Sequence, residues 1–268
     1  MKKLLAILGL IILVCTVPVT ASSIRPGWDF HWYPYHYGNL TGQIPQWINE
    51  TTMQELINTC PDLHQFNYQQ CIQITTTNKK QDDMLGNYLW FYITTSAKGD
   101  DQARVAISLV RNLPSDGTFA GRAVSAYQFQ YPYVSFGYTS SGVCSDRSIA
   151  LAWLLSRLGY DSSILWFNGG PYGSHMATGI RVNDSAPYNF NKTGYALLEI
   201  SDPAVPTAAA AVDQGSITVF KVGSGTKRMD LSKEWQDGNT WKDLLANYHY
   251  LNQSQLKQFS ALIQYYGC

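Results

Sequence analysis

The 268-residue sequence carries little charge and no net charge. Only 14% of its residues are Asp, Glu, Lys or Arg, and the 19 basic side chains balance the 19 acidic ones. A nucleic-acid-binding face requires clustered positive charge, so the sequence argues against a nucleic-acid partner. Tyr, Asn, Ser, Thr and Gln are abundant instead. Such a neutral, polar surface suits a protein outside the cell that meets peptide or carbohydrate polymers.

Motifs for metal binding and for serine hydrolysis are also missing. The chain contains no C-x2-C or H-x3-H spacing and no G-x-S-x-G elbow. Zinc sites require clustered Cys and His ligands, and serine hydrolases of the α/β type require that elbow. We therefore expect no metal and no other cofactor.

Long hydrophobic runs are absent except at the N-terminus. Two lysines precede an apolar run from Leu4 to Val19, and small residues follow it. This pattern is typical of a secretory signal peptide, so we expect cleavage near Ala21 and a mature protein that is secreted or held at the cell surface. An uncleaved membrane anchor is the alternative, because the run approaches the length of a spanning helix. N-x-S/T triplets that fit an extracellular location begin at Asn39, Asn49, Asn183, Asn191 and Asn252.

Cysteine is scarce, and four cysteines remain after removal of residues 1–21. Exported cysteines usually pair. Cys60 and Cys71 lie close together in a polar segment that contains a proline, so we predict a disulfide between them. Cys144 and Cys268 are then left over, either paired with each other or free.

The chain beyond the signal peptide divides near residue 120. Residues 22–75 are rich in aromatic residues and proline and lack a sustained period, which predicts an irregular region with a short helix around 52–58. Apolar spacing over 79–113 favours helices that break at S-A-K-G-D-D. We therefore predict an aromatic-rich and helical N-terminal region over 22–120 and a second domain over 121–268.

The sequence of the second domain predicts one helix followed by short strands. Apolar residues recur at helical spacing over 145–158, and Gly159 ends the segment. Runs bounded by Gly, Asn and Pro predict strands at 162–167, 175–182, 195–200 and 216–222, and the tail predicts one or two closing helices. This order indicates an α+β fold with an antiparallel sheet.

Cys144 begins the predicted helix, where the positive end of the helix dipole favours a thiolate. Its backbone N–H is also placed to stabilise an oxyanion. His175 starts a following strand and is the natural base, and Glu199 or Asp202 can orient its ring. The alternative interpretation is a structural or disulfide-bonded Cys144, an ordinary strand-edge His175 and solvated acidic residues.

Three segments together resemble the transglutaminase-like family of cysteine peptidases and acyltransferases, whose fold is related to papain. They are residues 131–167 with G-V-C-S-D at 142–146, G-S-H-M-A-T-G-I-R-V at 173–182, and G-Y-A-L-L-E-I-S-D-P at 194–203. In the family, Gly-x-Cys-x-Asp opens the helix, a His starts a following strand, and an acid closes the next strand after an aromatic residue, as Glu199 follows Tyr195. The family acid is usually Asp, which keeps Asp202 as a candidate.

The resemblance implies a transglutaminase-like core, in which the catalytic Cys lies at a helix N-terminus packed on an antiparallel sheet. It also suggests Gln128 as an oxyanion donor. The implied activity is that of a peptidase or amidase acting on peptide or carboxamide bonds of cell-surface polymers, with a cell-wall polymer among the candidate substrates. Three alternatives remain: a catalytically inactive binding module of the same fold, a protein-crosslinking acyltransferase, and an arylamine acyltransferase.

Overall fold

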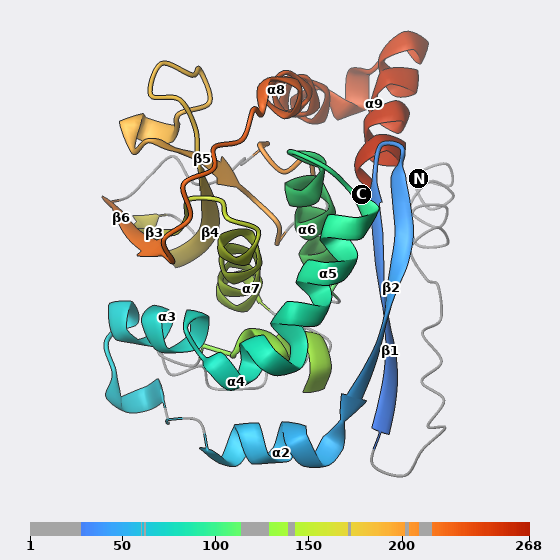
Figure 1. The fold of residues 1–268 in the computed structure, drawn as a ribbon. Coiled ribbons are helices and arrows are strands. Elements are labelled where there is room, and N and C mark those ends of the chain that lie inside the picture. The colour runs from blue at the N-terminus through green and yellow to red at the C-terminus, as the bar shows by residue number, and fades with distance from the viewer. Residues whose placement is uncertain are drawn as a thin grey trace.

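Figure 1 shows the fold of the chain, a computed structural model that describes residues 28–59, 61, 63–113, 129–138, 143–170, 173–201, 204–208 and 216–268. The predicted signal peptide, the boundary near residue 120, Cys60, Gln128 and Asp202 lie outside these residues. Across the described part, none of the helices has both the length and the apolar character that a membrane crossing needs.

A long β-hairpin forms where an irregular region was predicted. β1 (Trp28–Tyr37) and β2 (Leu40–Asn49) pair antiparallel along their full length and turn at Gly38, whose φ of 60° favours glycine. The prediction was wrong because Pro34 and Pro45, which usually mark loops, lie within the strands. Proline is tolerated at positions where no strand partner needs its N–H.

Helix α6 (Asp101–Arg111) and the residue that follows it bind the backbone of β1 directly. The Ser108 hydroxyl accepts a hydrogen bond from His36 N (2.7 Å) and donates one to His36 O (3.0 Å). Asn112 Nδ2 donates to Pro34 O (3.0 Å). Side chains from this helical segment thus satisfy the backbone groups that a neighbouring strand would otherwise bind.

The remaining N-terminal elements are short helices, and they confirm the predicted helical character of this part of the chain. They are α2 (Glu50–Thr59), η1 (Leu63–Gln65), α3 (Tyr68–Thr76), α4 (Lys79–Gln81), a π-helical turn η2 (Asp82–Gly86) and α5 (Asn87–Ser96). The chain breaks between α5 and α6 as predicted.

The C-terminal half contains a four-stranded antiparallel sheet in the order β5-β4-β3-β6. Its strands are β3 (Ser162–Gly170), β4 (Gly173–Arg181), β5 (Tyr195–Leu198) and β6 (Ser216–Val222). All four predicted strands are present, and the α+β class with antiparallel sheets is confirmed. Short helical turns η4 (Val134–Tyr138), η5 (Phe190–Lys192) and η6 (Tyr248–Tyr250) occur in the connections.

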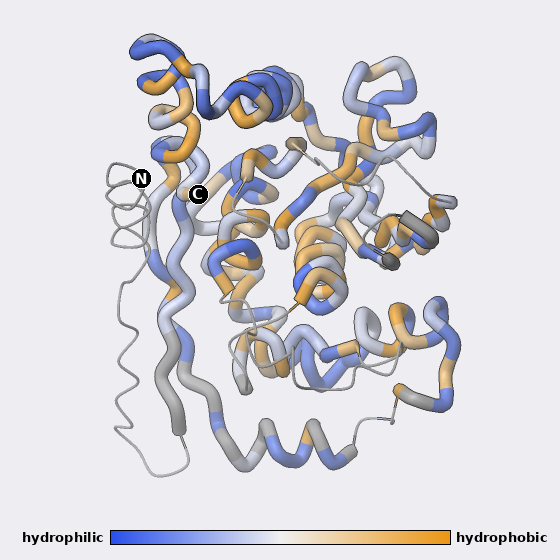
Figure 2. Tube along the Cα trace, turned by 180° about the vertical axis from the view of Figure 1, so that it is seen from behind, coloured by the Kyte–Doolittle hydropathy of each residue, from blue (hydrophilic) through white to orange (hydrophobic). Residues whose placement is uncertain are grey.

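Helix α7 (Cys144–Arg157) lies at the centre of the molecule, between the sheet and helices α5 and α6 (Figure 1). Its residues 149–155 are all buried, and the view from behind shows apolar residues along this helix (Figure 2). Burying so much apolar side-chain area is the main stabilising contribution to a fold of this kind. The first residue of this rigid, central helix is Cys144.

Two helices close the chain, as predicted, and they return to the hairpin. α8 (Ser232–Ala246) and α9 (Gln253–Tyr266) pack together. Gly38 N in the hairpin turn donates to Tyr265 O, and the Arg111 guanidinium donates to Tyr266 O and to Cys268 Sγ. The end of the chain is therefore bound to its first strands and to α6.

The predicted Cys60–Cys71 disulfide is not formed, so this prediction was wrong. Cys71 lies on α3 as a fully buried, free thiol, with Leu63 O 3.4 Å and Phe66 O 3.6 Å from its sulfur. Burial raises the pKa of this thiol. Its side chain is part of the hydrophobic core, where cysteine acts as a small apolar residue.

Candidate active site

Cys144 is the first residue of α7 and carries a free, partly exposed thiol. Because this thiol is free, the alternative disulfide between Cys144 and Cys268 is not formed. The helix begins here because the Asp146 carboxylate accepts a hydrogen bond from Val143 N (3.2 Å), as an acidic residue in a capping position does. The N–H groups of the first helical turn, including that of Cys144, are the ones without a carbonyl partner within a helix.

The sheet brings His175 and Glu199 together on neighbouring strands. His175 lies near the start of β4, and Glu199 directly follows β5. Antiparallel pairing of Thr178 with Leu198 directs the end of β5 toward His175. His175 Nε2 lies 2.6 Å from Glu199 Oε2, within strong hydrogen-bonding distance.

The Cys144 side chain lies close enough to the imidazole to raise the pKa of the ring. Since Nε2 binds Glu199, Nδ1 is the ring nitrogen left for the sulfur. Burial lowers the pKa of His175, but the interactions with Cys144 and Glu199 outweigh burial and raise its pKa to about 10. The ring therefore carries a proton at neutral pH, and its positive charge stabilises the neighbouring Glu199 carboxylate.

Both oxygens of the Glu199 carboxylate are bound. Oε2 faces His175, and Oε1 accepts a hydrogen bond from Ser201 N (2.8 Å). Burial raises the pKa of Glu199, but the interactions with His175 and Ser201 lower it by a larger amount. The pKa of Glu199 therefore lies below its ordinary value. The carboxylate is only 6% exposed, and it is fixed in one orientation toward the ring.

Two further polar residues of the first turns of α7 hold neighbouring parts of the site. Asp146 is fully buried, and its Oδ1 accepts a hydrogen bond from Gln130 N (2.9 Å). The Ser148 hydroxyl donates to Met176 O (3.0 Å), and the Thr178 hydroxyl donates to Ser148 O (3.1 Å). These bonds fix β4, and with it His175, against the helix that carries the thiol.

Arg147 connects the same helix to the segment that follows Glu199. It is 4% exposed, and its guanidinium donates to Ile200 O (3.1 Å), Ser201 O (3.2 Å) and Leu113 O. Arg147 was not predicted from the sequence, because an arginine among Ser, Asp and Ser is typical of an exposed helix face. Its position three residues after the candidate cysteine was the only available signal.

The structure thus brings together Cys144, His175 and Glu199 and leaves three sequence-predicted residues undescribed. Gln128, Asp202 and Cys60 lie outside the described residues. Within the described segments, no group of three or more His, Cys, Asp or Glu side chains is arranged to hold a metal ion. The arrangement can support acyl transfer, because it places a nucleophile and an orienting acid beside one proton carrier.

Comparison with known proteins gives little that identifies the chain. No protein-family model matches the sequence, and no curated protein matches it. A solved structure described as a crystal structure of a TGase is 14% identical and has a TM-score of 0.31. That match covers 59% of this chain and 43% of the other, so it spans less than half of that protein.

Proposed function

We propose that this protein is a secreted or cell-surface cysteine enzyme with a transglutaminase-like core, which cleaves peptide or carboxamide bonds. Cys144 is the nucleophile, His175 carries the proton, and Glu199 orients the imidazole. The observation that supports this proposal is the 2.6 Å contact between His175 Nε2 and Glu199 Oε2, together with the Cys144 side chain at the N-terminus of α7, which raises the pKa of the same imidazole.

The chemistry follows from these three groups. The Cys144 thiolate attacks the carbonyl carbon, and the helix N-terminal N–H of Cys144 stabilises the oxyanion that forms. The His175 imidazolium then donates its proton to the leaving amine, the C–N bond breaks, and a thioester remains. His175 next takes a proton from a water molecule, whose oxygen attacks the thioester. The C–S bond then breaks, the carboxylic acid leaves, and the Cys144 thiolate and the His175 imidazolium are restored.

The proposal takes Glu199 as the third member of the triad. Its Oε2 lies 2.6 Å from the ring, and its second oxygen is held by Ser201 N. A fixed carboxylate stabilises the imidazolium and keeps Nδ1 directed toward the sulfur.

The acyl acceptor and the substrate are further parts of the proposal. Water as the acceptor gives a peptidase or amidase, and a lysine amine gives a crosslinking acyltransferase. Hydrolysis of a peptide or protein in a cell-surface polymer is the reaction we propose. An inactive binding module would instead be expected to carry a Cys144–Cys268 disulfide or a His175 ring turned away from sulfur. The free Cys144 thiol, which raises the pKa of the His175 ring, supports the enzyme.

Thiol labelling tests the proposal. We expect iodoacetamide at pH 7 to modify Cys144 first, because its thiol is partly exposed at a helix N-terminus, whereas Cys71 is buried. Peptide mapping by mass spectrometry over time measures the order of modification. Modification of Cys268 or Cys71 before Cys144 would contradict the proposal.

Activity assays complete the test. Release of amine from a mixture of labelled peptides should stop in Cys144→Ser and His175→Ala but continue in the matched variant Cys268→Ser. A fluorescent primary amine added to the same assay distinguishes the acceptors, since a transferase attaches it to the substrate and a hydrolase does not. A Cys144 that labels rapidly without any turnover would support the binding module instead.

A further inference from the structure

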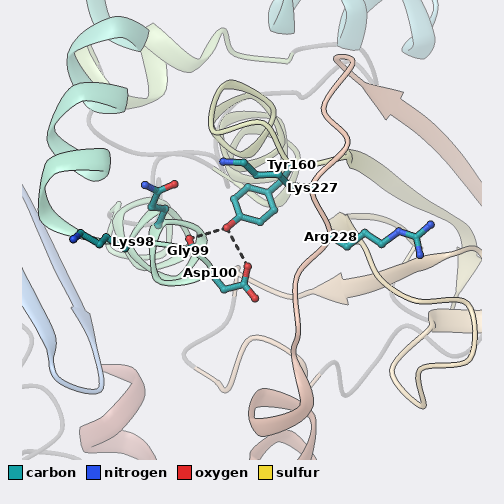
Figure 3. A pocket seen from close by; sticks show the side chains of 7 residues that line it. Lys98, Gly99, Asp100, Tyr160, Lys227 and Arg228 are labelled. Carbon is teal, nitrogen blue, oxygen red and sulfur yellow. Dashed lines mark hydrogen bonds between the residues drawn. The ribbon is translucent and has the colours of Figure 1, made fainter.

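Two clefts meet at the end of α7 that lies away from Cys144. The first, of about 530 Å³, is lined by Lys98, Asp100, Lys227 and Arg228 among others, and Figure 3 shows these side chains around it. The second, of about 650 Å³, has Arg228 in common with it. We call the two together the basic groove.

The basic groove has a fixed backbone. Thr226 N and Lys227 N both donate to Gly159 O (3.0 and 2.9 Å), and Asp161 N donates to Lys227 O (3.0 Å). A Cβ atom at Gly225 would lie 2.0 Å from Tyr160 O, so only glycine allows this close approach. The segment that carries Arg228 is therefore held against the end of α7.

Positive charge is concentrated in the basic groove although the chain has no net charge. Five cationic side chains and two carboxylates line the two clefts; the cations are Lys98, Arg181, Lys221, Lys227 and Arg228, and the acids are Asp100 and Asp161. Among the described residues, Arg228 donates to the neutral amide oxygen of Asn183 (2.9 Å), and Lys221 is 58% exposed and 3.7 Å from Asp161. Within the described part of the chain, Lys98, Lys227 and Arg228 form no ion pair.

The lining also carries groups that bind hydroxyls. The second cleft includes the hydroxyls of Ser224 and Thr226, and the Asp161 carboxylate there accepts hydrogen bonds. Its aromatic residue Tyr195 and the Tyr160 of the first cleft are almost fully buried, so neither ring offers a face for base stacking. Single-stranded nucleic acid depends on such stacking, whereas a sugar acid requires cations for its acid groups and hydroxyl-binding groups for its ring.

We propose that the basic groove is a binding site for an acidic polysaccharide, with Lys221 and Arg228 as its principal contacts to sugar carboxylates. The site is separate from the catalytic centre, because the fourteen residues of α7 place its two ends about 20 Å apart at 1.5 Å per residue. It does not depend on the proposed enzymatic function.

Calorimetric titration with tetragalacturonate tests this proposal, with neutral maltotetraose and a thymidine octanucleotide as comparison ligands. We expect binding of tetragalacturonate that weakens with added salt, no binding of maltotetraose, and weaker binding of the octanucleotide. The double variant Lys221→Ala/Arg228→Ala should bind tetragalacturonate at least about tenfold more weakly. Both side chains are at the surface, and a thermal melt confirms that the variant is folded.

Lys257→Ala on α9 is the matched control, since it removes an exposed lysine that lines neither cleft. It should bind like the wild type. Absence of binding by the wild type, equal binding of maltotetraose, tighter binding of the octanucleotide, or unchanged affinity in the double variant would each overturn the proposal. Labelling of Cys144 should be the same in wild type and double variant, which separates this result from the test of catalysis.

Discussion

At the scale of single residues, Glu199 and His175 determine how the site responds to pH. Because the folded-state pKa of His175, about 10, lies above its ordinary value of 6.5, the ring's contribution to stability is fully present below pH 6.5. It is lost as the pH rises through about 10. Glu199 behaves in the opposite sense, since its lowered pKa stabilises the fold above its ordinary value of 4.5 and this contribution is lost in acid.

Glu199→Gln should therefore move the alkaline limb of the pH–rate profile. Without the carboxylate, the pKa of His175 falls, so the imidazolium that protonates the leaving amine is lost at a lower pH. We expect kcat/KM to fall by about 10²–10⁴-fold at neutral pH, the range for removing support from a general acid–base group. Profiles of kcat/KM against pH measure both effects, and Asp202→Asn is the matched control. A shift in Asp202→Asn rather than in Glu199→Gln would assign the orienting role to Asp202.

The sequence could identify Cys144, His175 and Glu199 because their chemistry restricts the candidates. The chain has five histidines. Of the two that follow Cys144 in the sequence, His175 begins a predicted strand and His249 lies in the C-terminal tail. Cys71 was misjudged because the sequence does not show that its side chain is turned into the core. The cations of the basic groove were not found either, since they are spread from Lys98 to Arg228 and only the fold brings them together.

At the scale of elements, the first turns of α7 organise the site. Arg147→Met removes the donor for three carbonyls, those of Leu113, Ile200 and Ser201. We expect the free energy of unfolding to fall by about 3 kcal/mol, since each buried group left without a partner costs about 1–3 kcal/mol. Urea unfolding measures this change.

A positioning role for Arg147 also predicts a shift in the titration of His175, because the segment bearing Glu199 would lose its anchor. NMR titration of the His175 ring should show a lower pKa in Arg147→Met and a partial return in Arg147→Lys. Arg157→Met, at the other end of α7, removes an ion pair with Asp82 and should leave this titration unchanged. If the pKa of His175 is unchanged in Arg147→Met, Arg147 stabilises the fold but does not position the catalytic residues.

The elements of the C-terminal half were predictable, and the hairpin was not. Strands β3 to β6 are apolar runs bounded by Gly, Asn and Pro, so local sequence indicated them. In β1, the buried face consists of Tyr33 and Tyr37 with the half-buried Tyr35 between them, and the intervening Pro34 hides this alternation. The hydrogen bonds that β1 forms with Ser108 of α6 and with Asn112 just after it involve residues distant in the sequence, and no local pattern reveals them.

At the scale of the whole molecule, a buried carboxylate joins the first strand to the closing helices. Glu234 on α8 is fully buried; its Oε1 accepts hydrogen bonds from Arg104 Nε on α6 (2.7 Å) and from Tyr37 OH on β1 (3.1 Å). Removing one partner of a buried ion pair leaves the other charge uncompensated. This cluster is therefore a sensitive point of the fold although it lies outside the catalytic site.

Glu234→Gln should lower the free energy of unfolding by about 3 kcal/mol, at the lower end of the cost of breaking a buried pair. Urea unfolding followed by tryptophan fluorescence measures it. Lys233→Gln on the same helix removes an exposed pair with Asp237 and should cost less than about 1 kcal/mol. Equal effects of the two substitutions would show that burial adds nothing to the Glu234 interaction.

The contacts of the last residues have a consequence for biosynthesis. Until Tyr265 and Tyr266 have been made, Gly38 N and the Arg111 guanidinium lack carbonyls that they bind in the finished protein. Translation must therefore pass residue 266 before these two donors reach their final acceptors. A chain that stops before residue 265 would leave both donors without these acceptors.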